Sequence, residues 1–188
     1  KNTLLHIIEM EGHDIMNILS RSVLEMYTFD DNPDDLSKEN LMRQSIELIS
    51  KFPAIIAYAY NMYRHKHHGR SLHIRDAHPG FSLAENFLYM LKGGDYSDLD
   101  ARTLDLLLIL HSEHGGGNNS TFTVRVTSST GTDTYSSIAA GIGSLKGPKH
   151  GGANLKVCDM LSFLKSEIKD WKNDDEISTA IRRMLEGK

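Results

Sequence analysis

Apolar residues recur along most of this sequence at the spacing of an α-helix. The clearest stripe follows the pattern i, i+3, i+4, i+7 and consists of Leu104, Leu107, Leu108 and His111. Ser97 and Asp100, three positions apart, have the pattern of a capping box that begins this helix. We expect the glycines at 115–117 to end it. This periodicity predicts an all-α, multi-helical fold.

Similar patterns predict further helices on both sides of this one, at 14–26, 37–65, 83–91, 134–145, 154–171 and 175–185. The acidic segment 30–35 is expected to be a loop after the first of them. Pro53 lies inside the second, and we expect a kink there because proline removes an amide donor and clashes with the preceding turn. Small apolar residues at 138–143 predict a helix that packs closely against its neighbours.

One segment opposes this pattern. Residues 121–127 alternate in polarity and are rich in β-branched side chains, which indicates a strand. No second strand is evident to pair with it, and a lone strand would leave its backbone groups without partners. We therefore expect a buried helix at 121–127, against local propensity.

Composition excludes several classes of protein. The chain has 188 residues, 39% of them hydrophobic, which is enough for one domain, or for one domain and part of another. A net charge of −4 leaves no basic excess for nucleic acid, and no run of 18 apolar residues predicts a membrane span. No signal peptide is expected, because the first residues lack the charged, apolar and small segments of one. No intramolecular disulfide is expected, because Cys158 is the single cysteine. A reducing compartment, the cytoplasm, fits best.

The ten histidines are clustered, and the first cluster, His65, His67 and His68, lies between arginines and a lysine in 64–70. We interpret this run as a solvated basic loop, with binding of an anionic ligand as the alternative. No four ligands fall at the spacing of a zinc site, so we predict no metal.

Two other histidine groups adjoin glycines. His111 and His114 are three positions apart at the expected end of a helix, so they would share a face. Taken alone, His111 fits a hydrogen-bonded core histidine, whereas His114 fits an anion contact. His150 follows a Gly-Pro turn and precedes a helix, whose dipole favours the neutral imidazole that could donate to a developing oxyanion. A surface turn residue is the alternative for His150.

Segments HSEHG at 111–115 and SLKGPKHGGAN at 144–154 closely resemble the citrate synthase family. Segments LAENFLYML at 83–91 and STFTVR at 120–125 add to the resemblance, which covers most of the chain. It implies an all-α, multi-helical citrate synthase-like fold, with 1–150 as part of the large domain and 151–188 as the start of the small domain. It also implies a helix at 121–127.

The resemblance further implies an acyltransferase that condenses acetyl-CoA with oxaloacetate to give citrate and CoA, without a cofactor. His150 would be catalytic and stabilise the enol of the thioester. His114 and Asn118 would bind oxaloacetate, with His111 and Ser120 as supporting residues, Ser120 orienting the His150 ring. The family resemblance also implies a homodimer formed through segments 13–27, 37–65, 119–130 and 133–146.

The sequence departs from the family pattern in lacking a Gly-x-Gly-His segment, a following Asp-Pro-Arg, the catalytic aspartate and later arginines. We therefore expect a central fragment, truncated at both ends and inactive alone, because enolisation needs a base beside the hydrogen-bond donor. The alternatives are a 2-methylcitrate synthase, which uses propionyl-CoA, and a non-catalytic helical interaction module.

Overall fold

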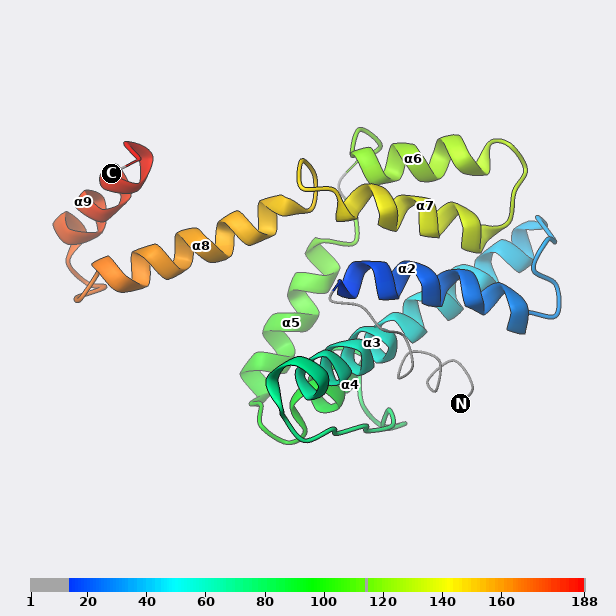
Figure 1. Ribbon diagram of the computed structural model, residues 1–188, viewed down its shortest axis with the longest axis horizontal. Helices are drawn as coiled ribbons and strands as arrows, with labels where there is room; N and C mark the ends of the chain where they lie inside the picture. The colour runs from blue at the N-terminus through cyan, green and yellow to red at the C-terminus, as the bar shows by residue number, and fades with distance from the viewer. Residues whose placement is uncertain (1–13, 114, 188) are drawn as a thin grey trace. The chain divides into compact units, whose positions relative to one another are not determined.

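The computed structural model describes residues 14–113 and 115–187, and every regular element within these ranges is helical. The all-α prediction is confirmed. In chain order the elements are α2 (Ile15–Met26), the 3₁₀-helix η1 (Tyr27–Phe29), α3 (Lys38–His68), α4 (Leu83–Lys92), α5 (Asp98–Leu110), α6 (Asn119–Ser128), α7 (Thr134–Lys146), α8 (Gly152–Glu167) and α9 (Asp174–Leu185) (Figure 1).

The chain divides into two compact units, the first ending at Leu145 and the second beginning at Lys146. Assignment of these units to the large and small domains of the family stays a prediction. None of the described helices is both long and apolar enough to cross a bilayer.

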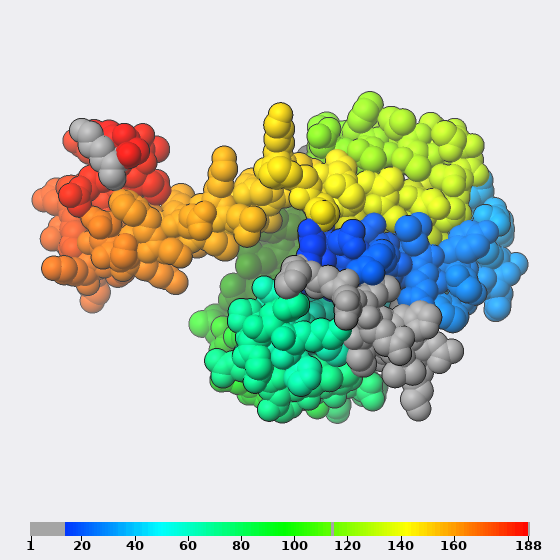
Figure 2. Space-filling model, viewed as in Figure 1, coloured from blue at the N-terminus to red at the C-terminus, as the bar shows by residue number. Residues whose placement is uncertain are grey.

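The core of the first unit lies where α2, α3, α4 and α7 meet (Figure 1). Helix α2 contributes Ile18, Leu19, Val23 and Met26, whose helical spacing places them on one buried face. Asn61 ties α3 to α4, since its Nδ2 donates to the Met90 carbonyl oxygen at 3.1 Å in a buried position. Helix α7 contacts α2 on one side and α6 on the other (Figures 1 and 2).

Several helix ends follow local sequence signals. Both halves of the predicted capping box between Ser97 and Asp100 are present at the start of α5, and Ser82 with Glu85 forms another at α4. Helix α3 remains continuous through Pro53, and the kink expected there stays a prediction.

The histidines of segment 64–70 belong to a helix, so our interpretation of this run as a loop is wrong for 64–68. Helix α3 continues to His68 and ends on Gly69, which has a left-handed φ of 60°. There the Arg70 N–H donates to the Arg64 carbonyl oxygen. Basic side chains in the last turn also suit the negative end of the helix dipole.

Segment 121–127 lies in α6, so the predicted helix is confirmed, but its predicted burial is wrong because none of its residues is buried. The hydroxyls of Thr123 and Thr127 donate to the carbonyl oxygens of Asn119 and Thr123, four residues earlier. Such back-bonding accommodates threonine in a helix despite its β-branching.

Helix α7 uses its small residues for packing inside the chain. A Cβ added to Gly141 would lie 2.5 Å from Val124 Cγ2 of α6. On the side toward α2, the Ala139 carbonyl oxygen accepts a bond from the Ser20 hydroxyl. The close packing predicted for 138–143 is therefore confirmed within one chain.

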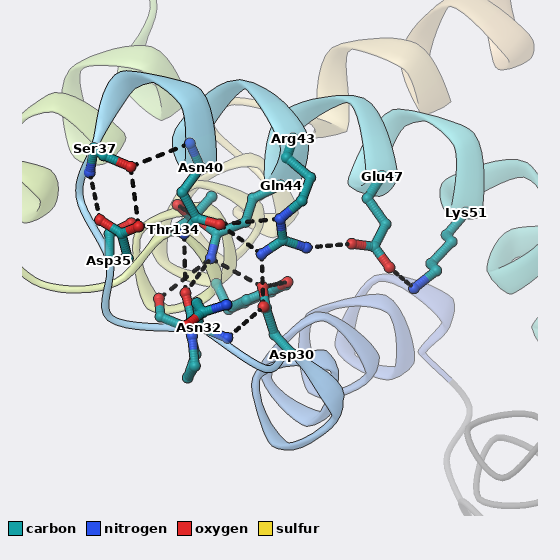
Figure 3. Close-up of polar contacts among 12 residues, drawn as sticks. Asp30, Asn32, Asp35, Ser37, Asn40, Arg43, Gln44, Glu47, Lys51 and Thr134 are labelled. Atoms are coloured by element: carbon teal, nitrogen blue, oxygen red, sulfur yellow. Dashed lines mark hydrogen bonds and ion pairs between the residues drawn. The ribbon is translucent and has the colours of Figure 1, made fainter.

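A polar cluster around the Asp30 carboxylate joins the loop after α2 to α3 and α7 (Figure 3). The Asp30 side chain is 1% exposed. It accepts hydrogen bonds from Arg43 Nη2 at 2.6 Å and Gln44 Nε2 at 3.0 Å, both on α3. It also accepts from the Tyr135 hydroxyl of α7 at 2.6 Å and the Asn32 N–H at 2.9 Å.

Burial alone would raise the pKa of Asp30, but the bonds from Tyr135, Asn32, Gln44 and Arg43 outweigh it and hold that pKa well below its ordinary value. Burial and the bond to Asp30 raise the pKa of Tyr135. The ionised carboxylate and the protonated phenol therefore stabilise each other across 105 residues of sequence.

The second unit, residues 146–187 as described, is held by fewer buried groups. Ile168 and Ala180 are buried. The Glu176 carboxylate accepts hydrogen bonds from the N–H groups of Lys169 and Asp170, and Arg183 forms an ion pair with Glu167 at 2.6 Å. Helix α8 ends at Glu167, four residues before the predicted 171, because the backbone becomes extended at Ile168, its C-cap.

Replacing Asp30 by Asn should lower the free energy of unfolding by about 2–3 kcal/mol at neutral pH, because bonds to a charged acceptor are lost. The depressed pKa of Asp30 adds stability above its unfolded pKa of about 4, and this stability declines as pH falls below that value. Urea unfolding from pH 6 to pH 3 should therefore show a shallower decline for Asp30→Asn than for the exposed control Asp31→Asn. Equal slopes would contradict this.

Replacing Gly141 by Ala should destabilise the chain by about 1–3 kcal/mol, because the new Cβ overlaps Val124, whose β-branched side chain is stiff. Gly143→Ala is the matched control in the same helix, since nothing lies within 4 Å of its Cβ position. That change should stabilise the helix by about 0.5–1 kcal/mol. Thermal melts compare the two variants, and a higher Tm for Gly141→Ala than for Gly143→Ala would refute the packing argument.

Candidate active site

The first group of predicted site residues lies around the connection between α5 and α6. Helix α5 ends at Leu110, before the glycines that we expected to end it, and His111 is its C-cap. His111 Nδ1 bonds the Leu107 carbonyl oxygen at 2.7 Å. Because a carbonyl oxygen only accepts, Nδ1 carries the proton of this hydrogen bond. His111 is hydrogen-bonded as expected, but it is exposed, so its predicted core position is wrong.

His114 lies outside the described residues, so its predicted contact with oxaloacetate stays a prediction. The early end of α5 does change one expectation. His111 is a cap and the helix stops before it, so α5 does not provide the helical face that the two histidines were expected to share.

The glycines at 115–117 leave space beside the loop for the guanidinium of Arg125. Gly115 has a left-handed φ of 78°, and its N–H donates to Glu113 Oε1 at 2.6 Å. A Cβ on Gly116 would lie 2.9 Å from Arg125 Nη1 of α6, so only glycine leaves Arg125 its present position. Our sequence analysis did not single out Arg125. Its spacing of seven residues from Asn118, two helical turns, is the signal that could have found it.

Asn118 and Ser120 begin α6. The Asn118 side chain caps the helix, since its Oδ1 accepts from the Ser120 N–H at 3.1 Å and from the Ser120 hydroxyl at 2.7 Å. Both residues are half-buried. The loop therefore presents a fixed amide and a guanidinium from one helix, an arrangement that can bind a carboxylate.

His150 lies in the tight turn that connects α7 to α8. Its N–H and that of Gly151 both donate to the Gly147 carbonyl oxygen, at 2.9 and 3.0 Å. The ring is half-buried one residue before the Gly151 N-cap of α8, where no side chain occupies the cap position. The sequence predicted this position, next to the positive end of a helix.

His150 belongs to the second unit and Ser120 to the first, and each unit is described by itself. The predicted orientation of the His150 ring by Ser120 therefore stays a prediction. In the described ranges, no three His, Cys, Asp or Glu side chains gather in a way that could hold a metal ion.

Comparison with known proteins decides the family. The family described as citrate synthase, C-terminal domain, matches residues 1–188. Citrate synthase 2 of Bacillus subtilis is 36% identical over 179 residues, which are 95% of this chain. The chain belongs to the citrate synthase family.

The crystal structure of citrate synthase from Pyrobaculum aerophilum agrees, with a TM-score of 0.73 and 31% identity over 89% of this chain and 42% of that one. The chain spans 44% of the length of the Bacillus subtilis citrate synthase. The 2-methylcitrate synthase 1 of Corynebacterium glutamicum is also 36% identical, over 81% of this chain and 39% of its own length. Overall similarity to citrate synthases therefore does not identify the acyl-CoA.

Asn118 has a capping role that can be separated from its predicted role in binding. Asn118→Ala should lower the free energy of unfolding by about 1 kcal/mol, because α6 loses its N-cap. Asn118→Asp keeps an acceptor for the Ser120 groups and should retain near wild-type stability. Chemical unfolding measures both variants, and equal losses would show that capping is not what Asn118 contributes.

Proposed function

We propose that this protein catalyses the condensation of acetyl-CoA with oxaloacetate to citrate and CoA, as an acyltransferase of the citrate synthase family. The observation that carries this proposal is the position of His150 in a glycine-rich turn at the N-terminus of α8. Acetyl-CoA is a substrate, and the proposed reaction requires no cofactor.

His150 donates a hydrogen bond to the thioester carbonyl oxygen as a base removes a proton from the acetyl methyl group. This hydrogen bond stabilises the negative charge that develops on the carbonyl oxygen as the enol forms. The enol carbon then attacks the ketone of oxaloacetate, and hydrolysis of citryl-CoA releases CoA. The base in this proposal is the aspartate that the family resemblance implies. We expect it to lie outside these 188 residues, and we therefore expect these residues alone to be inactive.

Oxaloacetate lies against the loop between α5 and α6 in this proposal. His114 and Asn118 bind it, and His111 and Ser120 support that loop through their bonds to the Leu107 carbonyl oxygen and to Asn118. The Arg125 guanidinium over Gly116 supports the assignment, because the ligand is a dicarboxylate.

We also propose that the protein is a cytoplasmic homodimer formed through α2, α3, α6 and α7. Exposed apolar residues support this assembly, namely Met42, Ile46 and Ile49 on α3 and Phe122 and Val126 on α6. Ala139 and Gly141 of α7 pack within one chain and so add no argument for a dimer. The exposed thiol of Cys158 fits a reducing compartment. Light scattering measures the assembly, and a monomer mass at micromolar concentration would contradict it.

The second candidate is 2-methylcitrate formation from propionyl-CoA, favoured by the similarity to 2-methylcitrate synthases. The two substrates differ by one methylene, which a pocket distinguishes by about 1–3 kcal/mol. A non-catalytic helical module is the remaining alternative, and it predicts no turnover with either substrate.

The test is release of CoA from acetyl-CoA or propionyl-CoA, with oxaloacetate, by the protein in its natural form. We expect a kcat/KM for acetyl-CoA about tenfold or more above that for propionyl-CoA. His150→Ala should lower kcat by about 10²–10³, the loss typical of one donor to a developing oxyanion.

Lys165→Ala, an exposed residue of the same helix, is the control and should retain full activity. Preference for propionyl-CoA would favour the second candidate. Unchanged turnover in His150→Ala would refute the role of this histidine, and no turnover with either substrate would refute both reactions.

A further inference from the structure

Three consecutive glycines, at 115–117, lie between the end of α5 and Asn118, the N-cap of α6. Glycine loses more conformational freedom on ordering than any other residue, so this segment is the hardest part of the loop to hold in one conformation. In the proposed reaction oxaloacetate binds this loop, and any ordering left to the moment of binding would weaken its affinity. Interactions that order the glycines beforehand therefore affect substrate binding directly.

The end of α5 is completed by residues other than Glu113. His111 Nδ1 bonds the Leu107 carbonyl oxygen, and the Ser112 hydroxyl donates to the Ile109 carbonyl oxygen, both at 2.7 Å. These bonds satisfy carbonyl groups of the last helical turn, which holds no basic side chain. A carboxylate just beyond this turn is near the negative end of the helix dipole. The dipole therefore disfavours a charge at Glu113.

Glu113 instead bonds forward, into the glycine segment. Its Oε1 accepts a hydrogen bond from the Gly115 N–H at 2.6 Å, a short distance that is expected for an ionised acceptor. Gly115 has a left-handed φ of 78°, which glycine adopts without strain. Arg125 of α6 approaches the next residue, since a Cβ on Gly116 would lie 2.9 Å from its Nη1. The backbone of these two glycines is thus contacted by a carboxylate and by a guanidinium.

We propose that Glu113 is a positioning residue that orders the glycine loop for oxaloacetate. The inference rests on the proposed function, because the ligand that the loop serves is the substrate of that reaction. In the sequence, His114 lies between the two residues that this bond joins, and Asn118 follows Gly115 by three positions. Glu113 therefore acts through the backbone of the segment that carries both predicted oxaloacetate ligands. A charge that breaks a local rule without a gain in stability is typical of a functional site.

The test is steady-state kinetics of the protein in its natural form, with varied oxaloacetate and varied acyl-CoA. Glu113→Ala should raise the KM for oxaloacetate about tenfold and leave kcat and the KM for the acyl-CoA nearly unchanged, because the lost bond orders the loop equally in the ground and transition states. Glu113→Gln keeps an uncharged acceptor and should raise that KM about threefold. Glu113→Asp should retain a near wild-type KM, because an aspartate bonds the N–H two residues later in an Asx-turn.

Asp105→Asn is the matched control, since it removes the same charge from an exposed position of α5 and should leave the KM unchanged. Stability separates positioning from a structural role. Glu113→Gln should leave the free energy of unfolding unchanged or slightly higher, because the helix dipole no longer opposes a charge. Hydrogen–deuterium exchange of segment 111–118 should be faster in Glu113→Ala and near wild type in Glu113→Asp.

An active Glu113→Ala variant with an unchanged KM for oxaloacetate would overturn the proposal, and so would a marked loss of stability in Glu113→Gln. Equal exchange in Glu113→Ala and wild type would overturn the ordering of the loop by Glu113 whether or not the protein is active. Absence of turnover in the wild-type protein would instead refute the proposed function, so the two failures are distinguishable.

Discussion

The first unit depends on one buried charge. Asp30 lies in a loop, yet its carboxylate accepts hydrogen bonds from α3, from α7 and from its own turn. An uncompensated carboxylate in that position would be strongly unfavourable, and these donors together compensate its burial. Position 30 therefore constrains where α7 can lie against α2 and α3, and α7 leads directly into the turn of His150.

Much of the fold was predictable because helical period and capping are local properties of sequence. The capping box at Ser97 illustrates this. The helix over 121–127 does not, because its local pattern indicates a strand, and the helix was inferred from the lack of a partner strand and from the family resemblance. The ends of α3 and α5 were placed wrongly for a physical reason. Helix α3 ends at Gly69, whose backbone is left-handed. Helix α5 ends before His111, whose side chain bonds a carbonyl oxygen of the last turn. The spacing of hydrophobic residues predicts neither of these ends.

Within the candidate site, sequence motifs were enough to select His150 and Asn118. The same motifs did not predict which side chains lie close to them in space. Arg125 approaches the glycine loop because α6 turns it toward Gly116. Segment 30–35 looked like an ordinary acidic loop, and nothing in its composition distinguished Asp30 from its exposed neighbour Asp31. The contacts of Asp30 with Arg43, Gln44 and Tyr135, the last of them 105 residues away, distinguish the two.

That separation has a consequence for synthesis on the ribosome. Chains elongate at roughly 5–20 residues per second, so the Tyr135 hydroxyl becomes available to Asp30 about 5–20 s after Asp30 itself is made. During that interval α2 and α3 exist without Tyr135, the fourth donor to the Asp30 carboxylate. The nascent helices are therefore expected to stay loosely packed and accessible to chaperones, and to become tightly docked only when α7 has emerged.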